Sequence, residues 1–252
     1  MTKIFATDFD GTLYFHNEPE PIRAADLDAI RAFQESGGLF GACTGRPVRA
    51  LTTQTLGVVP FDFYIALSGA TLHDRGVEPI MPASLPRPVV REIYDRFAPH
   101  ARDNTALVCA ADDYWTFDKT LVEAWPISWA PDFDHLPDPM QGFGLETTTI
   151  EEAQELADRV NREYADIACA YVNLASIDVL PVGHSKGTGL RKAAEHFGAT
   201  LTAGIGDSFN DLPLLDAADV AYTFHTAPQD MRAHADVLVD SVAEAIEDFM
   251  AR

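Results

Sequence analysis

The sequence has few basic residues and no long apolar run. Its 252 residues include 18 Lys and Arg against 39 Asp and Glu, which gives a formal net charge of −21. A chain this acidic repels nucleic acids and anionic membrane surfaces. No apolar run approaches the ~18 residues that a membrane-spanning helix needs. The composition therefore predicts a cytoplasmic protein with neither a nucleic-acid partner nor a membrane partner.

Cysteine is also scarce, and its spacing excludes two classes of small protein. The chain has three cysteines, Cys43, Cys109 and Cys169, and no C-x-x-C pair. This argues against a disulfide framework and against a zinc-cysteine site, so we expect three free thiols in a reducing compartment. The remaining composition is ordinary, with 47% hydrophobic and 23% charged residues. It predicts one or two domains with a sizeable core.

Three short apolar segments have the pattern of buried strands. They occupy residues 4–7, 39–43 and 200–205, and each runs into polar residues. Short apolar runs that stop at turn residues are typical of the central strands of a parallel sheet. Helical patterns separate them, at 24–34 and 187–197, and glycine follows each helical pattern. The alternation of strand and helix predicts a doubly wound α/β sheet.

The middle of the chain has a different pattern. Residues 85–181 contain two helix candidates, one after Pro88 and one that opens at Thr149 with capping-box spacing. Between and after them, strand candidates lie at 105–109, 114–117, 142–147 and 169–180. We interpret this region as a second α/β domain inserted into the first, which would then comprise 1–84 and 182–252. The tryptophans of the inserted region are expected to pack in its core or at an interface: Trp115, Trp125 and Trp129.

Polar residues follow the predicted strands, and open α/β sheets bind ligands beyond the carboxyl ends of their strands. If the strands are neighbours, four carboxylates, a lysine and a threonine hydroxyl meet at one edge of the sheet. Clustered carboxylates need a cation, and oxygen ligands beside phosphate suit Mg2+. Lysine, threonine hydroxyls and helix N-termini bind phosphate. The residues concerned are Asp8, Asp10, Gly11 and Thr12, then Thr44, Gly45 and Arg46, then Lys186, and finally Asp207, Ser208, Asn210 and Asp211.

This set of side chains is suited to phosphoryl transfer. An aspartate that faces a phosphate beside magnesium is a competent nucleophile, and its attack produces an aspartyl-phosphate. A second aspartate two residues further along can protonate the leaving oxygen and then deprotonate a water. Asp8 and Asp10 have this spacing.

The same residues resemble a known family. Residues 8–13, D-F-D-G-T-L, resemble the D-x-D-G-T-L signature of the haloacid dehalogenase (HAD) superfamily. Residues 44–46, Lys186 and the G-D-S-F-N-D of 206–211 resemble its second, third and fourth motifs, in the same order. The G-D-x-x-N-D phrase is similar to the Cof-like branch, mostly phosphatases of small phosphorylated metabolites. The resemblance implies a Rossmann-like HAD core and an inserted type-IIB α/β cap that selects the substrate.

The resemblance also implies a role for each matching residue. Asp8 would be the nucleophile and a magnesium ligand, and Asp10 the general acid and base, with its backbone carbonyl on the metal. Lys186 would hold the phosphate and offset the charge of Asp8. The remaining residues would complete the two sites, with Asp207 and Asp211 on magnesium and Thr44, Gly45 and Asn210 on the phosphate side.

Two positions depart from the Cof-like pattern and leave the substrate open. Ser68 and Thr226 stand where relatives tend to carry asparagine. The predicted function is a Mg2+-dependent phosphatase that hydrolyses a small phosphorylated metabolite, such as a sugar phosphate, through an aspartyl-phosphate. The protein would be a monomer or a homodimer. Two alternatives stay open: a phosphomutase of the same superfamily, and a receiver-like domain in which a phosphoaspartate persists as a signal.

Overall fold

The chain folds into two compact units. The structure is a computed structural model that describes residues 2–16, 18–55, 57–75, 79–124 and 127–252. One unit comprises Met1–Thr44, Gly57–Met81 and Ser185–Arg252, and the other comprises Gly45–Leu56 and Pro82–His184. Residues 45–56 are predicted to belong to the core, whereas here they group with the second unit. Arg49 in this segment donates to Asp113 of the same unit at 2.8 Å.

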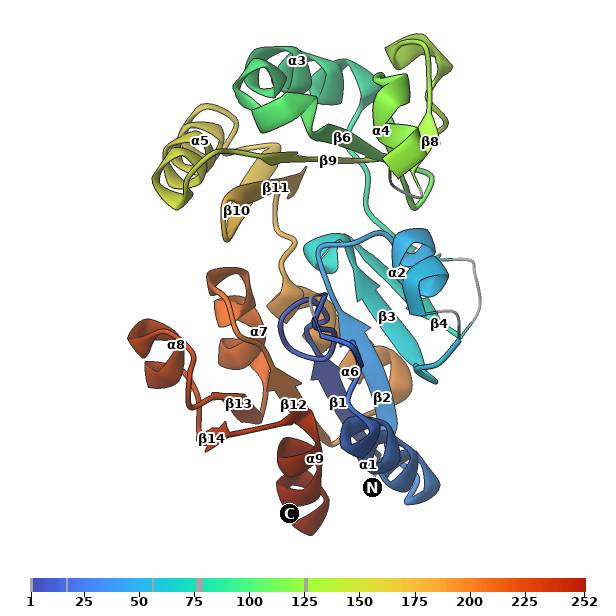
Figure 1. Cartoon of the computed structure of the whole chain (residues 1–252), viewed down its shortest axis with the longest axis vertical. Helices are drawn as coiled ribbons and strands as arrows, with labels where there is room; N and C mark the ends of the chain where they lie inside the picture. The colour runs from blue at the N-terminus through green and yellow to red at the C-terminus, as the bar shows by residue number, and fades with distance from the viewer. Residues whose placement is uncertain (1, 17, 56, 76–78, 125–126) are drawn as a thin grey trace. The chain divides into compact units, whose positions relative to one another are not determined.

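The described residues of the first unit form an eight-stranded sheet (Figure 1). In sheet order its strands are β14 (Val237–Val239), β13 (Val220–Phe224), β12 (Leu201–Ile205), β1 (Lys3–Thr7), β2 (Leu39–Cys43), β3 (Phe63–Ala66), β4 (Thr71–Asp74) and β5 (Pro79–Pro82). The pairs from β14 to β3 are parallel, and β4 is antiparallel to β3. All three predicted core strands are therefore present, and β1 lies between the other two.

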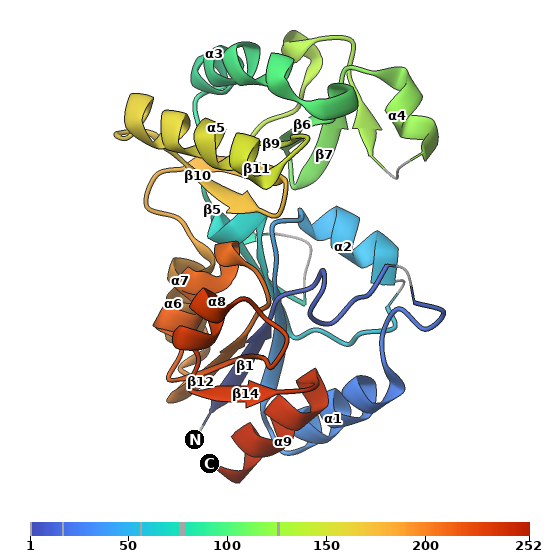
Figure 2. The ribbon, with the colours of Figure 1, turned by 60° about the vertical axis from the view of Figure 1, so that its left-hand side comes forward.

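Helices cover both faces of this sheet. They are α1 (Ala24–Glu35), α6 (Lys186–Phe197), α7 (Leu212–Ala217), α8 (Gln229–Ala233) and α9 (Val242–Ala251). Side chains of β1 alternate between the faces, as strand geometry requires. Phe5 packs against Phe33 of α1 and Phe249 of α9. The helices α1 and α9 lie beside each other in Figure 2. Ile4 belongs to the cluster that contains Leu190 of α6. The predicted doubly wound sheet is confirmed.

The second unit is built on a sheet of mostly antiparallel strands. In sheet order they are β10 (Ala168–Asn173), β11 (Ser176–Pro181), β9 (Met140–Glu146), β6 (Ala106–Ala110), β7 (Asp113–Thr116) and β8 (Ser128–Trp129). Its helices are α2 (Val48–Thr55), α3 (Arg87–Phe97), α4 (Lys119–Ala124) and α5 (Ile150–Glu163). The amphipathic helices α3 and α5 contribute Val90, Ile93 and Leu156 to a shared apolar core. Thr149 caps α5 as predicted, because its side chain accepts from the Glu152 N–H.

Two details of this unit differ from the sequence analysis. The strand expected at 169–180 is an antiparallel hairpin, β10 with β11, whose turn places Leu174 at φ 52°. Leucine rarely adopts such a backbone, so Leu174 itself gives no sequence signal for a turn. Trp115 packs against the core, one of the two expected environments, whereas Trp129 lies outside the core, exposed beneath the Lys119 ammonium. Trp125 lies outside the described residues.

Short 3-10 helices occur in the connections of both units. They are η1 (Leu67–Gly69), η2 (Ala98–His100), η3 (Arg102–Asn104), η4 (Phe133–His135) and η5 (Phe209–Asp211). Within the ranges that the structure describes, no helix combines the length and the apolar character needed to cross a lipid bilayer.

Candidate active site

The pairing of β1 with β12 brings two predicted acidic residues to the same edge of the sheet. The strands are parallel, and Thr7 is in register with Ile205. Asp8 follows β1 directly, and its N–H donates to the carbonyl of Ile205 at 2.9 Å. Asp207 follows β12 after one glycine. One strand pair therefore brings together two residues that lie about two hundred positions apart in the sequence, as predicted.

Two glycines allow the acidic residues to approach the backbone closely. A Cβ atom on Gly206 would lie 2.3 Å from Cγ of Asp211. A Cβ atom on Gly11, whose φ is +82°, would lie 2.8 Å from Oδ2 of Asp207. Both separations are shorter than real Cβ contacts, and the φ of Gly11 is one that other residues rarely adopt. Glycine at these positions is thus a geometric requirement of the site.

Lys186 is placed by the capping of α6. The Ser185 side chain accepts from the Thr188 N–H at 3.1 Å, and the Thr188 hydroxyl accepts from the Ser185 N–H at 2.9 Å. This reciprocal capping box fixes the start of the helix and makes Lys186 its first residue. Lys186 is 1% exposed. Its Nζ donates to Oδ1 of Asp8 at 2.6 Å and to Oδ1 of Asp211.

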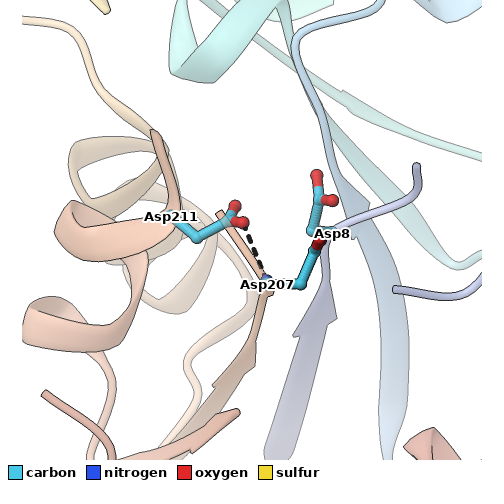
Figure 3. Close-up of side chains that lie close together, drawn as sticks. All are labelled: Asp8, Asp207 and Asp211. Carbon is cyan, nitrogen blue, oxygen red and sulfur yellow. Dashed lines mark hydrogen bonds between the residues drawn. The ribbon is translucent and has the colours of Figure 1, made fainter. Parts of the chain in front are cut away.

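Asp211 anchors the segment after β12 as well as the lysine. Its Oδ2 accepts from the N–H groups of Asp207 and Ser208, both at 3.1 Å, while its Oδ1 faces Lys186. In Figure 3 its carboxylate points toward Asp207 and Asp8. Asp207 in turn accepts from the hydroxyl of Thr12 at 2.8 Å. These bonds link the residues after β1, the residues after β12 and the start of α6.

The three aspartates form a compact cluster. One carboxylate oxygen each from Asp8, Asp207 and Asp211 lie within 4.8 Å of one another. Burial raises the pKa of Asp8 well above its usual range, and the Asp211 charge raises it further. Burial and the same neighbour also raise the pKa of Asp207. Burial alone would lower the pKa of Lys186, but Asp211 and Asp8 outweigh it and raise that pKa well above its usual range.

The donor set fits a hard divalent cation. All the clustered ligand atoms are carboxylate oxygens, which Mg2+ prefers over nitrogen or sulfur. One lysine opposes three carboxylates, so an excess of negative charge remains when all are ionised. A divalent cation would favour the ionised carboxylates that burial and mutual repulsion oppose. Among the described residues, Asp8, Asp207 and Asp211 are grouped closely enough to hold it.

Asp10 lies in the loop that follows Asp8, next to the cluster in sequence. Its side chain is 32% exposed, and its Oδ1 is 2.8 Å from Nε2 of His16. The loop closes through a hydrogen bond from the Gly11 N–H to the Tyr14 carbonyl at 2.9 Å. His16 has no role in the sequence analysis, because no motif or spacing distinguishes it from any other exposed histidine.

Thr44 sits at the end of β2, on the strand beside β1. It is buried, its N–H donates to the Ile65 carbonyl, and its own carbonyl accepts from the Ser68 N–H, both at 2.9 Å. Gly45 follows it as the first residue of the second unit, and its carbonyl accepts from the Tyr114 hydroxyl at 3.5 Å. Thr44 therefore shares the edge of the sheet that carries Asp8, and phosphate binding by Thr44 and Gly45 stays a prediction.

Asn210 has a neighbour that the sequence analysis does not consider. Its side chain is buried, and Oδ1 accepts from the Ser208 hydroxyl at 2.6 Å. Ser208 and Thr12 received no individual role, yet Ser208 contributes its N–H to Asp211 and Thr12 its hydroxyl to Asp207. Thr12 lies in the motif at 8–13 and Ser208 in the motif at 206–211, and this position is the sequence signal that points to them.

A doubly wound sheet whose carboxyl edge carries a lysine among aspartates is typical of phosphoryl-transfer enzymes. A family model for haloacid dehalogenase-like hydrolases matches residues 5–250 of the chain. The chain belongs to this family. The family predicted from residues 8–13 and the three later motifs is thereby confirmed, together with the enzyme class.

The chain is also similar to individual phosphatases along most of its length. It is 21% identical to the pyridoxal phosphate phosphatase YbhA of Escherichia coli (strain K12), over 99% of this chain and 97% of the relative. It is 26% identical to the 5-amino-6-(5-phospho-D-ribitylamino)uracil phosphatase YwtE of Bacillus subtilis (strain 168), over 86% of this chain and 85% of the relative. Among solved structures, the HAD subclass IIB sugar phosphatase BT4131 superposes with a TM-score of 0.79 at 20% identity, covering 99% of this chain and 100% of that one. That likeness establishes the fold.

Proposed function

We propose that the protein is a Mg2+-dependent phosphatase that hydrolyses a small phosphomonoester through an aspartyl-phosphate on Asp8. The observation that carries the proposal is the buried contact of Lys186 with Asp8 and Asp211, beside Asp207. The buried lysine opposes the rise in the Asp8 pKa and orients the carboxylate, as a nucleophile requires, and a bound cation would favour the ionised form further. A purely structural ion pair would not need Asp207 beside it, whereas a divalent cation needs several oxygen ligands.

The reaction takes two displacements. An oxygen of Asp8 attacks phosphorus, the bond from phosphorus to the substrate oxygen breaks, and Asp10 donates a proton to that oxygen. Water then attacks the same phosphorus, Asp10 takes a proton from it, and the bond to Asp8 breaks to release phosphate. Each residue ends the cycle in the protonation state in which it began.

The remaining side chains bind and orient the phosphate. Lys186 would neutralise a phosphoryl oxygen while holding Asp8, and Thr44, Gly45 and Asn210 would donate hydrogen bonds to the others. Magnesium would be held by Asp8, Asp207 and Asp211 together with the carbonyl of Asp10. When bound, it supplies positive charge that stabilises the charge on the transferring phosphoryl group.

The substrate class follows from the relatives and from the sequence. Two relatives along most of the chain are a pyridoxal phosphate phosphatase and a phosphatase of a ribitylaminouracil phosphate. Both act on small phosphorylated molecules, and we propose the same class here. Ser68 and Thr226, which replace asparagines of the Cof-like pattern, argue against transferring either substrate directly. A cytoplasmic location and a monomeric or homodimeric state remain predictions, and the three free cysteines are consistent with the first.

The experiment is phosphate release from a panel of phosphorylated metabolites, with Mg2+ present or removed by EDTA. We expect turnover that requires Mg2+ and that Asp8→Asn abolishes, because an amide is not a nucleophile toward phosphorus. Rapid quenching and mass spectrometry should show wild-type protein carrying one phosphoryl group on the peptide that contains Asp8.

The matched control is Asp216→Asn, since Asp216 is an exposed aspartate of the same unit paired with His234. It should retain wild-type turnover, and circular dichroism should show both variants folded. Appreciable turnover by a folded Asp8→Asn protein would contradict the covalent step. Formation of an isomeric phosphate ester without free phosphate would identify a mutase instead.

A further inference from the structure

His16 makes a contact that the catalytic scheme does not use. Its Nε2 lies 2.8 Å from Oδ1 of Asp10, the residue assigned as general acid and base. The imidazole is 49% exposed and the Asp10 side chain 32% exposed. Asp10 is thus the more solvent-accessible of the two predicted carboxylates after β1, since Asp8 is buried. An exposed carboxylate needs a partner if one rotamer is to predominate.

The histidine is supported by a stack of aromatic side chains. Phe9 is fully buried, and Tyr14 stacks on it with ring centroids 5.0 Å apart and an interplanar angle of 18°. His16 meets the Tyr14 ring edge-on at 4.8 Å and 80°. The backbone closes the same loop, because the Tyr14 N–H donates to the Phe9 carbonyl at 2.8 Å. The stack therefore anchors the imidazole to the core next to Asp10.

We propose that His16 is a positioning residue for Asp10, and this inference rests on the proposed function. When Asp10 is a carboxylate, the Nε2–H of His16 donates to Oδ1 and fixes the torsion of the carboxyl group. The proton that Asp10 transfers then belongs to Oδ2. That proton passes to the leaving oxygen in the first displacement, and Oδ2 regains one from water in the second.

Such positioning has a specific kinetic consequence. A misplaced acid slows only the steps that need its proton, and a leaving group that departs as a stable anion needs none. The p-nitrophenolate of p-nitrophenyl phosphate is such a group, whereas the phenolate of phenyl phosphate is more basic and benefits from protonation. The two esters have similar size and the same phosphoryl group, so they differ mainly in their need for Asp10.

The test compares kcat/KM of wild type and His16→Ala on these two esters, because kcat/KM covers the steps up to leaving-group departure. We expect about a 3- to 10-fold loss on phenyl phosphate, the range for one hydrogen bond, and less than about 2-fold on p-nitrophenyl phosphate. His16→Gln should restore most of the loss, since its amide N–H reaches a similar position to Nε2. His234→Ala is the control: its ring contacts Asp216 at 2.7 Å on the surface of the same unit and should change neither value.

A double-mutant cycle separates a role through Asp10 from a general disturbance of the loop. In an Asp10→Asn background, His16→Ala should have no further effect on phenyl phosphate, because its target is already lost. Equal losses on both esters, or an undiminished loss in the Asp10→Asn background, would overturn the role of His16 alone. A folded wild-type protein that releases phosphate from neither ester, nor from the metabolite panel, would contradict the proposed function as well.

Discussion

Lys186 forms ion pairs with two carboxylates at once, and its side chain is buried. A charged group removed from water costs several kcal/mol unless partners replace the lost hydration. The partners of Nζ of Lys186 are Asp8, directly after β1, and Asp211, in η5 after β12. Losing either partner would leave a buried charge uncompensated. The side chains of the site are therefore held in place by the same charges that the proposed reaction uses.

At a second residue pair, between β13 and α9, a titrating partner should make stability depend on pH. The Tyr222 hydroxyl donates to Oδ2 of Asp248 at 2.6 Å. This bond, together with Arg252, holds the pKa of Asp248 below its usual range. A carboxyl with a lowered pKa in the folded state stabilises it above the unfolded pKa, and that contribution is lost as pH falls through the folded pKa. We expect Tyr222→Phe to lower the free energy of unfolding by about 1 kcal/mol at pH 7. Urea unfolding should show this difference shrinking below about pH 4.

Tyr94→Phe is the control for that experiment. The Tyr94 hydroxyl donates to the backbone carbonyl of Ala106 at 3.3 Å, and a carbonyl does not titrate. Its loss should cost a similar free energy at both pH values. A Tyr222→Phe penalty that is equally independent of pH would contradict the assignment to Asp248.

At the scale of elements, the residue at which α6 begins determines where Lys186 lies. A helix beginning one residue later would move Lys186 out of the first turn and away from Asp8. The Ser185 and Thr188 capping box prevents this, and Gly198 at φ 62° ends the helix in a left-handed cap. The sequence predicts this helix at 187–197 from its apolar spacing and Gly198, and the observed helix begins one residue earlier.

Ser185→Ala should therefore affect both stability and activity. Loss of an N-cap side chain costs about 1 kcal/mol of unfolding free energy. Because the frayed first turn carries Lys186, we also expect kcat for phosphate release to fall several-fold. Urea unfolding and steady-state kinetics on the same preparation measure the two effects.

Ser241→Ala separates the two effects. Ser241 caps α9 in the same way, accepting from the Glu244 N–H at 3.1 Å, but its helix carries none of the predicted site residues. It should lose a similar free energy of unfolding and keep its kcat. If Ser185→Ala lowers stability without lowering kcat, the cap does not position Lys186.

The sequence predicts the elements that local pattern determines and misses those that contacts determine. Apolar runs locate β1, β2 and β12, because buried parallel strands leave this pattern, and helical spacing with glycine stops locates α1 and α6. The hairpin of β10 and β11 turns at Leu174, a residue that gives no turn signal. The motifs identify Asp8 and Lys186. Their contact depends on strand order, however, and the His16 contact depends on an aromatic stack that no motif encodes.

At the scale of the whole molecule, the chain is strongly acidic although its proposed substrate is an anion. The formal charge is −21, and the site itself adds three carboxylates around one lysine. Screening resolves this conflict, because exposed charges act over ~8 Å at physiological ionic strength. Remote acidic residues therefore contribute little at the phosphate, where Lys186 and a bound cation dominate. The net charge instead acts on the folded state through self-repulsion.

Stability should consequently increase with ionic strength at neutral pH. Raising NaCl from a few millimolar to about 0.15 M shortens the Debye length severalfold and weakens the repulsion among surface carboxylates. We expect Tm to rise by roughly 2–4 °C, about 1 kcal/mol for a chain of this size. Differential scanning calorimetry in metal-free buffer measures it, and choline chloride should give the same rise, since the effect depends on ionic strength. Near pH 4, where many carboxylates are protonated, the rise should be smaller. A Tm that stays constant or falls with salt at neutral pH would show that local ion pairs, such as Arg102 with Glu146 at 2.7 Å, outweigh the net repulsion.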